Sequence, residues 1–122
     1  MVFDMSEAKI PDFEDMLKVS AEIRDMSLEK TRLELIIEDS VAKTVRMLTT
    51  NAEYYVNGKP PSMSFINATY AFSGINGEIY EYRVKLGNVT AELEFLKNKL
   101  TIYRDMIDVW RTISANKRAS VI

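Results

Sequence analysis

The chain contains no cysteine and no histidine among its 122 residues. Disulfide bonds and thiolate zinc sites are therefore impossible, and the Ser-His and Cys-His pairs of nucleophilic catalysis cannot be built. The Glu-x-x-His pairs of di-iron helical bundles are excluded for the same reason. Carboxylates, lysine, tyrosine and serine remain, and these occur in every soluble protein. We therefore predict a protein that is not an enzyme and that holds no metal and no cofactor.

Long apolar runs are also missing. No stretch approaches the roughly 20 apolar residues that span a bilayer, and the N-terminal stretch is acidic where a secretory signal would be basic and then apolar. Apolar residues nevertheless make up 47% of the chain, enough for a real core. These features predict a single cytoplasmic domain over residues 1–122, with a flexible N-terminus at 1–10 and neither a membrane nor a small-molecule substrate as partner.

Proline is confined to Pro11, Pro60 and Pro61, which leaves two long segments free of helix breakers. Pro11 precedes a run of carboxylates, and both features suit the first turn of a helix. Steps of three and four residues between apolar positions predict one amphipathic helix over 11–56. The pattern slips in phase near 27–30, where we expect a bend. The apolar positions are Phe13, Leu17, Ile23, Met26, Leu33, Ile37, Val41, Val45, Leu48, Ala52 and Tyr55.

Turn residues separate this helix from the next one. Asn57-Gly58 supplies residues that readily adopt the left-handed conformation of a helix C-terminus, and the double proline after it forbids continuation. A serine at Ser62 or Ser64 is suited to cap a short helix, predicted over residues 62–73.

Residues 77–118 predict the longest helix. Its apolar positions alternate steps of three and four over more than four heptads, and the pattern runs in phase through Gly87-Asn88. Such a 3.5-residue period is typical of a coiled-coil seam, so we expect a continuous helix. The seam consists of Ile79, Tyr82, Leu86, Val89, Leu93, Leu96, Leu100, Tyr103, Ile107 and Trp110.

A second apolar stripe follows the C-terminal half of this helix and consists of Phe95, Ile102, Met106, Val109 and Ile113. A helix that is apolar on two faces must be covered on both. The first long helix covers the seam, and a second copy of the chain is the simplest cover for the stripe. We therefore predict a homo-oligomer whose interface contains the stripe and Trp110. The alternative is that the short helix covers the stripe with Phe65, Ile66, Tyr70 and Phe72.

Charge is unevenly distributed although the net charge is only −2. Residues 1–40 carry 11 acids against 5 bases, whereas residues 96–122 carry 6 bases against 2 acids. The basic end is suited to nucleic-acid phosphates, to the acidic end of a neighbouring subunit, or to the negative end of its own helix dipole. The bases that enter a candidate nucleic-acid site here are Arg104, Arg111, Lys117 and Arg118.

A tyrosine pair marks the end of the first predicted helix. Tyr54 and Tyr55 lie next to Lys59 in the turn, and Lys43 and Arg46 precede them on the helix. Paired tyrosines beside a lysine can stack unpaired bases and contact phosphates. They can equally be the last core contact before the turn.

Together these patterns predict an all-α fold, in which two long helices form an extended antiparallel hairpin with coiled-coil-like packing and a short connecting helix. This order resembles UvsY-type recombination mediators and related small helical early proteins of tailed phages. The resemblance covers residues 28–118, and it is carried by Tyr54-Tyr55 with Gly58-Lys59 and by the run AELEFLKNKLTIYRDMIDVW.

The resemblance implies a homo-oligomer in the cytoplasm, or in the host cytoplasm for a viral protein. Such a protein binds single-stranded DNA and helps to load a recombinase onto strands covered by single-strand-binding protein. The expected function is thus a non-enzymatic recombination mediator or accessory of DNA metabolism. The alternative is a structural or protein-interaction module, such as a virion-assembly, adaptor or inhibitor protein, without a nucleic-acid role.

Overall fold

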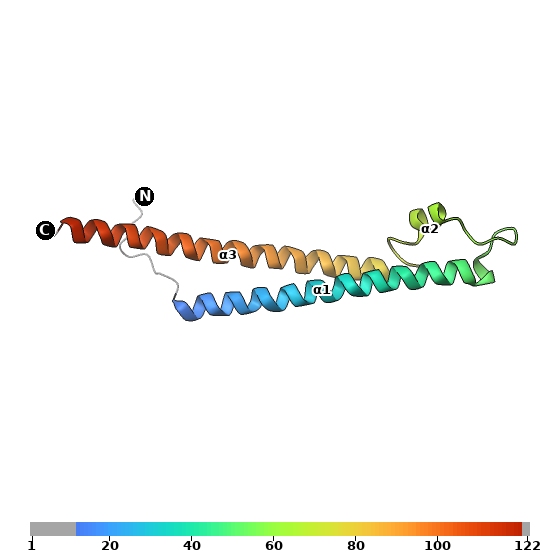
Figure 1. Cartoon of the computed structure of the whole chain (residues 1–122), viewed down its shortest axis with the longest axis horizontal. Helices are drawn as coiled ribbons and strands as arrows, with labels where there is room; N and C mark the ends of the chain where they lie inside the picture. The colour runs from blue at the N-terminus through green and yellow to red at the C-terminus, as the bar shows by residue number, and fades with distance from the viewer. Residues whose placement is uncertain (1–11, 121–122) are drawn as a thin grey trace. The chain divides into compact units, whose positions relative to one another are not determined.

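The protein is an all-α helical hairpin, as the sequence predicts. The computed structural model describes residues 12–120, so the predicted N-terminal segment 1–10 and Pro11 lie outside the described residues. Helices α1 (Phe13–Thr50) and α3 (Glu78–Ser120) are long, whereas α2 (Met63–Thr69) and the 3-10 helix η2 (Ala52–Tyr54) are short. The long helices run antiparallel and pack together (Figure 1).

The hairpin divides into two compact units, and each long helix contributes to both. Unit 1 contains α1 up to Met26 together with α3 from Glu92, and unit 2 contains Ser27–Ala91. The boundary on α1 coincides with the change of phase in the apolar pattern. α1 itself is helical without interruption through residues 27–30, and α3 is helical through Gly87-Asn88.

Side-chain caps lie at the start of α1 and at the start of the 3-10 helix η2 that follows it. The carboxylate of Asp12 accepts a 2.8 Å hydrogen bond from the backbone N–H of Asp15, which satisfies a free donor of the first turn. At the other end Asn51 is extended and its side chain accepts from the N–H of Glu53, which starts η2. α1 therefore ends at Thr50, so the predicted helix end at residue 56 is wrong.

The Asn57-Gly58 pair forms a two-residue turn rather than the predicted helix cap. Both residues have positive φ, 53° and 75°, as a type I′ turn requires. Val56 and Lys59, on either side, exchange two backbone hydrogen bonds of 2.9 and 3.1 Å. Asn57, Gly58 and the two prolines after them thus belong to a local hairpin, which the helical pattern before them did not predict.

Ser62 caps α2 by accepting a 3.2 Å hydrogen bond from the N–H of Phe65. The helix ends at Thr69, short of the predicted residue 73, and the chain then turns at Gly74 with a φ of 81°. The carbonyl of Ser73 then accepts from the N–H groups of Ile79 and Tyr80 and so caps the start of α3.

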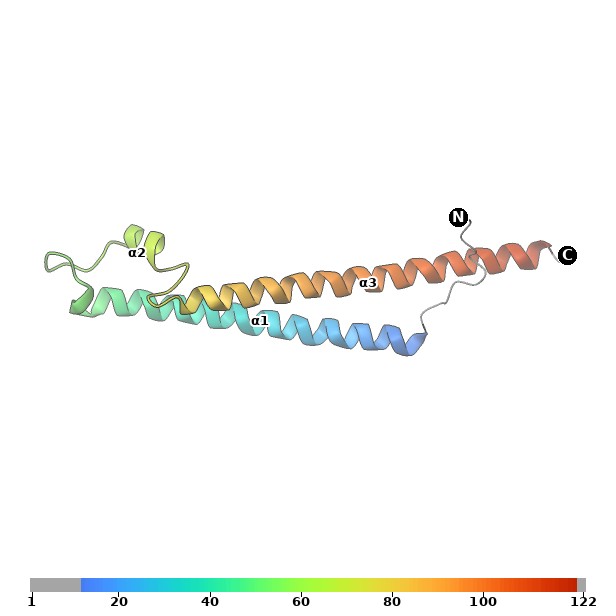
Figure 2. The same cartoon turned by 180° about the vertical axis from the view of Figure 1, so that it is seen from behind.

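All three helices supply the core of unit 2. Its buried apolar side chains are Leu33, Ile37, Leu48, Ile66 and Ile79, and the buried hydroxyl residue is Thr44. The hydrogen bond from Arg32 is the main cause that lowers the pKa of Glu29 of α1, and the positive charge of Lys85 of α3 adds to this effect. α2 lies beside the hairpin in both views (Figures 1 and 2).

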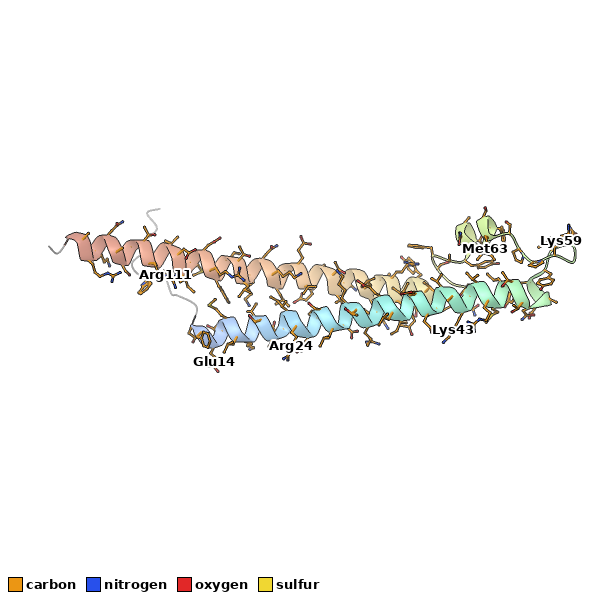
Figure 3. All side chains as sticks on the ribbon, in the orientation of Figure 1. Glu14, Arg24, Lys43, Lys59, Met63 and Arg111 are labelled. Carbon is orange, nitrogen blue, oxygen red and sulfur yellow. The ribbon has the colours of Figure 1, made fainter. Side chains whose placement is uncertain are left out.

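Unit 1 has a smaller core, built from Val19 of α1 and from Leu93 and Leu96 of α3. The helix α3 continues past the first turn of α1 in both views, so its last turns have no described helix beside them (Figures 1 and 2). The labelled side chains make the same point, since Arg111 lies beyond Glu14 along α3 (Figure 3). This overhang explains why burial decreases toward the C-terminus of α3.

Candidate functional site

The predicted second stripe of α3 is an exposed apolar face. Four members, Phe95, Ile102, Met106 and Val109, are exposed, at 59%, 56%, 37% and 39% of their surface, and Ile113 is partly buried. We call these five residues the α3 face. Separations of four, seven and eleven residues bring them to one side of the helix, because each residue turns the helix by about 100°. The face lies within unit 1.

Trp110 differs from the rest of the predicted seam. The other seam residues are buried or partly buried, whereas Trp110 is 48% exposed. Its place in the overhang of α3 explains the difference, because the described part of α1 does not reach it. The indole therefore extends the exposed apolar surface from the seam toward the α3 face.

The short helix does not cover the α3 face. α2 belongs to unit 2, and of its predicted covering residues Ile66 is buried there whereas Phe65 and Phe72 are exposed. Phe65 packs edge-on against Tyr70, with ring centroids 6.1 Å apart. Within the described chain the α3 face thus has no cover, which leaves the alternative in which α2 covers it without support.

Basic side chains form a row on another side of α3. Arg104, Arg111 and Arg118 follow one another at seven-residue intervals, and Lys97 precedes them at the same interval. We call these four residues the basic row; all are exposed. Arg118 donates to the carbonyl of Ser114 at 3.4 Å, whereas no ion pair within residues 12–120 involves Lys97, Arg104 or Arg111.

Lys97 is not among the bases that the sequence analysis predicted for a nucleic-acid site. A search for bases at seven-residue spacing would have found it. Lys117, by contrast, does not follow this spacing. It lies about 120° around the helix from Arg111, since six residues turn the chain by about 600°.

The predicted nucleic-acid residues Lys43, Arg46 and Lys59 belong to unit 2, whereas the basic row belongs to unit 1. The ammonium of Lys43 lies 2.8 Å from the carboxylate of Asp39 on the surface of α1. Arg46 is exposed on the same helix, and Lys59 is exposed in the tight turn (Figure 3). The predicted bases are therefore divided between the two compact units.

The tyrosine pair closes the end of α1. Tyr55 is partly buried, and its hydroxyl donates a 3.0 Å hydrogen bond to the carbonyl of Thr49. Tyr54 is partly buried at the end of η2. The hydroxyl of Tyr55 thus satisfies a carbonyl that the helix end would leave free, and this contact favours the structural interpretation of Tyr55 over base stacking.

A second exposed apolar row, on α1, was not recognised as such from the sequence. Phe13, Leu17, Leu28 and Leu35 are exposed, at 75%, 53%, 65% and 61%. We call these four residues the outer row of α1. The sequence pattern assigned Phe13 and Leu17 to the core stripe, and this assignment is wrong because Val19 is the buried residue there. Separations of four, seven and eleven residues would have identified the row.

No group of three or more acidic side chains within residues 12–120 is arranged to hold a metal ion. The search for a membrane span also found none: across the helices of the described chain, no segment is both long and apolar enough to cross a bilayer.

Comparison of the chain with protein-family models, with curated proteins and with solved structures found no match. The likeness to UvsY-type mediators accordingly remains a prediction from the sequence pattern. What the chain can do must be inferred from its own surfaces, of which the α3 face, the outer row of α1 and the basic row are the most distinctive.

Proposed function

We propose that the protein is a non-enzymatic assembly protein that forms homo-oligomers through the C-terminal half of α3. The observation that carries this proposal is the α3 face, whose large side chains Phe95, Ile102, Met106 and Val109 are exposed on one side of α3 in unit 1. Scattered apolar residues are common on protein surfaces, but a contiguous apolar patch usually marks a protein contact. The protein accordingly belongs among structural or protein-interaction modules that act in the cytoplasm.

The spacing of the α3 face supports helix-to-helix packing as the mode of contact. Ile102, Met106 and Val109 alternate steps of four and three, the pattern with which helices interlock side chains in a coiled coil. Trp110 lies beside them and adds the largest apolar surface available to any residue type. Covering these side chains removes apolar surface from water, which drives association at about 25 cal/mol per Å².

Light scattering tests this proposal. The wild-type protein at micromolar concentration is expected to have a mass well above the 14.0 kDa of one chain. Replacing Phe95→Glu and Ile102→Glu together should produce a monomer with unchanged helix content, since both side chains are exposed and both positions accept glutamate in a helix. A Thr101→Glu/Thr112→Glu variant, with the same added charge on another side of α3, should keep the wild-type mass. A monomeric wild type would refute the proposal.

The basic row favours a second function, binding of single-stranded DNA by a recombination mediator or DNA-metabolism accessory. Lys97, Arg104 and Arg111 are exposed without an ion pair in the described chain, so their charges are available to phosphates. One such row is weakly basic, but an oligomer repeats it and gains affinity by avidity. A recombinase or a single-strand-binding protein would be its protein partner.

A salt titration with single-stranded DNA separates the two functions. For a mediator, the logarithm of the binding constant should decrease with the logarithm of salt concentration by about 0.7 per phosphate contact. Arg104→Gln/Arg111→Gln should reduce that slope, whereas Lys18→Gln/Arg24→Gln removes the same charge from α1 and should not. Absence of binding to wild-type protein at low salt would leave the assembly protein without a nucleic-acid role.

A further inference from the structure

The α3 face has nearly the same pattern of residues in both directions along the helix. Phe95 and Ile113 lie nine residues before and after Arg104, and Ile102 and Met106 lie two residues before and after it. All of them belong to unit 1. Two such faces that run in opposite directions can therefore bring Phe95 opposite Ile113 and Ile102 opposite Met106, so that each apolar side chain meets another one.

The side of α3 that carries this face differs from the side that packs in the core of unit 1. The core residues of α3 there are Leu93 and Leu96. They precede Ile102 by nine and six residues, which places them about 180° and about 120° around the helix from it. A helix of a second copy can therefore lie along the α3 face and leave that core in place.

Lys99 selects the orientation of the second helix. It precedes Met106 and Ile113 by seven and fourteen residues and so takes the same heptad position on this side of α3. In a parallel pair in register each heptad position packs against its own copy, which would put two Lys99 ammonium groups into one apolar layer. In the antiparallel pair Lys99, five residues before Arg104, lies opposite Val109, five residues after it.

One edge of the face carries groups that complement one another in the antiparallel pair. Measured around the helix from Ile102, four side chains lie about 60° to 80° to the same side: Glu92, Lys99, Trp110 and Lys117. A twofold axis perpendicular to both helices brings this edge of one copy against the same edge of the other. Glu92 then lies opposite Lys117, a pair of opposite charges, and Lys99 lies opposite the indole of Trp110. Each contact forms twice.

The other edge of the face carries one repulsive contact. Asp105 follows Arg104 by one residue, so the two Asp105 carboxylates approach each other across the twofold axis. Both are exposed, so water and salt screen the repulsion. In a parallel pair this edge would meet the edge of Trp110 instead, and Asp105 would not meet its own copy. Asp105 therefore distinguishes the two orientations.

We infer that two copies of the chain associate through their α3 faces, with the two α3 helices antiparallel and a twofold axis at the level of Arg104. This inference rests on the proposed self-assembly and adds its geometry. The contact is isologous, because the same surface of both copies takes part, so two copies occupy it completely and form a closed dimer.

The absence of cysteine makes this geometry directly testable by cross-linking. The variants Glu92→Cys and Asn116→Cys each place one thiol at an exposed end of the face. Residues 92 and 116 lie twelve residues on either side of Arg104, so the thiols of the two variants lie opposite each other in the antiparallel pair. Identical thiols are then about 36 Å apart, whereas a disulfide needs Cα atoms within about 7 Å. Lys97→Cys, on the far side of α3, is the control.

The antiparallel pair predicts a distinctive set of products. After mild oxidation, an equimolar mixture of Glu92→Cys and Asn116→Cys should give a covalent dimer that mass spectrometry identifies as one copy of each variant. Each variant alone should remain a single chain on a denaturing gel, and Lys97→Cys mixed with Asn116→Cys should cross-link about tenfold more slowly. Under reducing conditions, light scattering should give two chains of 14.0 kDa for the wild type.

Charge exchange gives a second measurement that needs no cysteine. Glu92→Lys and Lys117→Glu each bring like charges together, so each should raise the dissociation constant of the dimer by about threefold. The double variant Glu92→Lys/Lys117→Glu restores opposite charges and should return this constant to within about twofold of the wild type. Asp105→Asn should lower it, because the repulsion across the axis is removed.

Three other results would overturn the inference, and they can be told apart. Cross-linking of each single-cysteine variant with itself shows a parallel pair, which leaves the proposed assembly function intact. A wild type that associates, together with a mixture that cross-links no faster than the control or a double exchange that restores nothing, shows that another arrangement holds the copies together. A wild type that is monomeric at micromolar concentration removes the assembly function and its geometry together.

Discussion

Arg83 of α3 binds Phe72, eleven residues earlier in the chain, in two ways. Its Nε donates a 2.8 Å hydrogen bond to the carbonyl of Phe72, and its guanidinium lies 4.8 Å from the centre of the same ring. A second nitrogen donates to the carbonyl of Ala71 at 3.3 Å. The planar guanidinium thus ties the turn after α2 to α3, and the ring of Phe72 in turn contacts Tyr80 at a centroid distance of 6.3 Å.

Arg83→Ala should therefore destabilise unit 2. It leaves two carbonyls without these donors and removes the cation from the ring, and we expect the free energy of unfolding to decrease by about 1.5 kcal/mol. Arg83→Lys should recover only part of this loss, because an ammonium cannot reproduce the planar fork. Urea denaturation gives the measurement, and Arg24→Ala, which removes an exposed ion pair, should change stability by less than about 0.5 kcal/mol. Equal effects of both alanine variants would contradict the assignment.

Tyr55→Phe tests the role of the tyrosine pair. The substitution keeps the ring and removes the hydroxyl that donates to Thr49, so stability should decrease by about 1 kcal/mol. Affinity for single-stranded DNA should not change, since base stacking requires only the ring. A stable variant with weakened DNA binding would show that the hydroxyl acts on a ligand instead.

Three glycine-to-alanine substitutions should differ in sign and size. Gly74 has a φ of 81°, and a Cβ there would lie 2.7 Å from the carboxyl group of Glu78. Gly58 has a φ of 75° with open space around it, whereas Gly87 lies inside α3 with open space and no such constraint. We expect Gly58→Ala to cost about 1 kcal/mol, Gly74→Ala to cost more, and Gly87→Ala to stabilise the protein by about 0.5 to 1 kcal/mol. Thermal unfolding compares the three; a neutral Gly74→Ala would be inconsistent with the close approach.

Glu78 should make stability depend on pH. Hydrogen bonds to its carboxylate from its own backbone N–H and from those of Asn76 and Ile75 hold its pKa below the ordinary value of 4.5. The unfolded chain therefore takes up the proton first, and the stabilisation present above pH 4.5 is lost as the pH falls through the lower folded pKa. Denaturation as a function of pH should show a shallower acid decrease for Glu78→Gln than for the wild type. A Glu34→Gln control should retain the wild-type decrease.

The single tryptophan reports self-association. Trp110 is 48% exposed in one chain and lies beside the α3 face, so assembly should move it from water into an apolar contact. We expect its fluorescence emission to shift to shorter wavelength as the wild-type concentration rises, and to remain at long wavelength in the Phe95→Glu/Ile102→Glu variant. Trp110→Ala should then weaken assembly more than it lowers chain stability. Emission that does not depend on concentration while the mass increases would place Trp110 outside the contact.

The order of helices could be predicted from single residues with strong local effects. Proline at Pro60 and Pro61, the hydroxyl of Ser62 and the seven-residue pattern of α3 act over a few residues, and the corresponding elements are present. Helix ends were predicted less well. α1 was expected to continue to residue 56, but Asn51 forms a local cap and starts η2, a competition between side chain and helix that apolar spacing does not reveal.

Which apolar side chains are exposed depends on how the helices pack. The stripe on α3 was visible as a pattern, but only the fold shows that no described helix covers that side of α3. Phe13 and Leu17 lie out of phase with Ile23 and the core residues after it, since six residues separate Leu17 from Ile23, and the structure buries Val19 instead of them. Tyr55 was equally suited to a ligand or to the fold until the position of its hydroxyl against Thr49 was known.

The sequence by itself determined the fold class and the chemistry that is excluded, because periodicity, proline positions and the absence of histidine and cysteine are properties of the chain alone. Only the tertiary structure decided which apolar residues are covered. A periodic pattern indicates that a helix has an apolar side. The lengths and register of the packed helices determine which of its sides another helix covers. For this protein that distinction leaves the α3 face and the outer row of α1 exposed, and its proposed assembly rests on the α3 face.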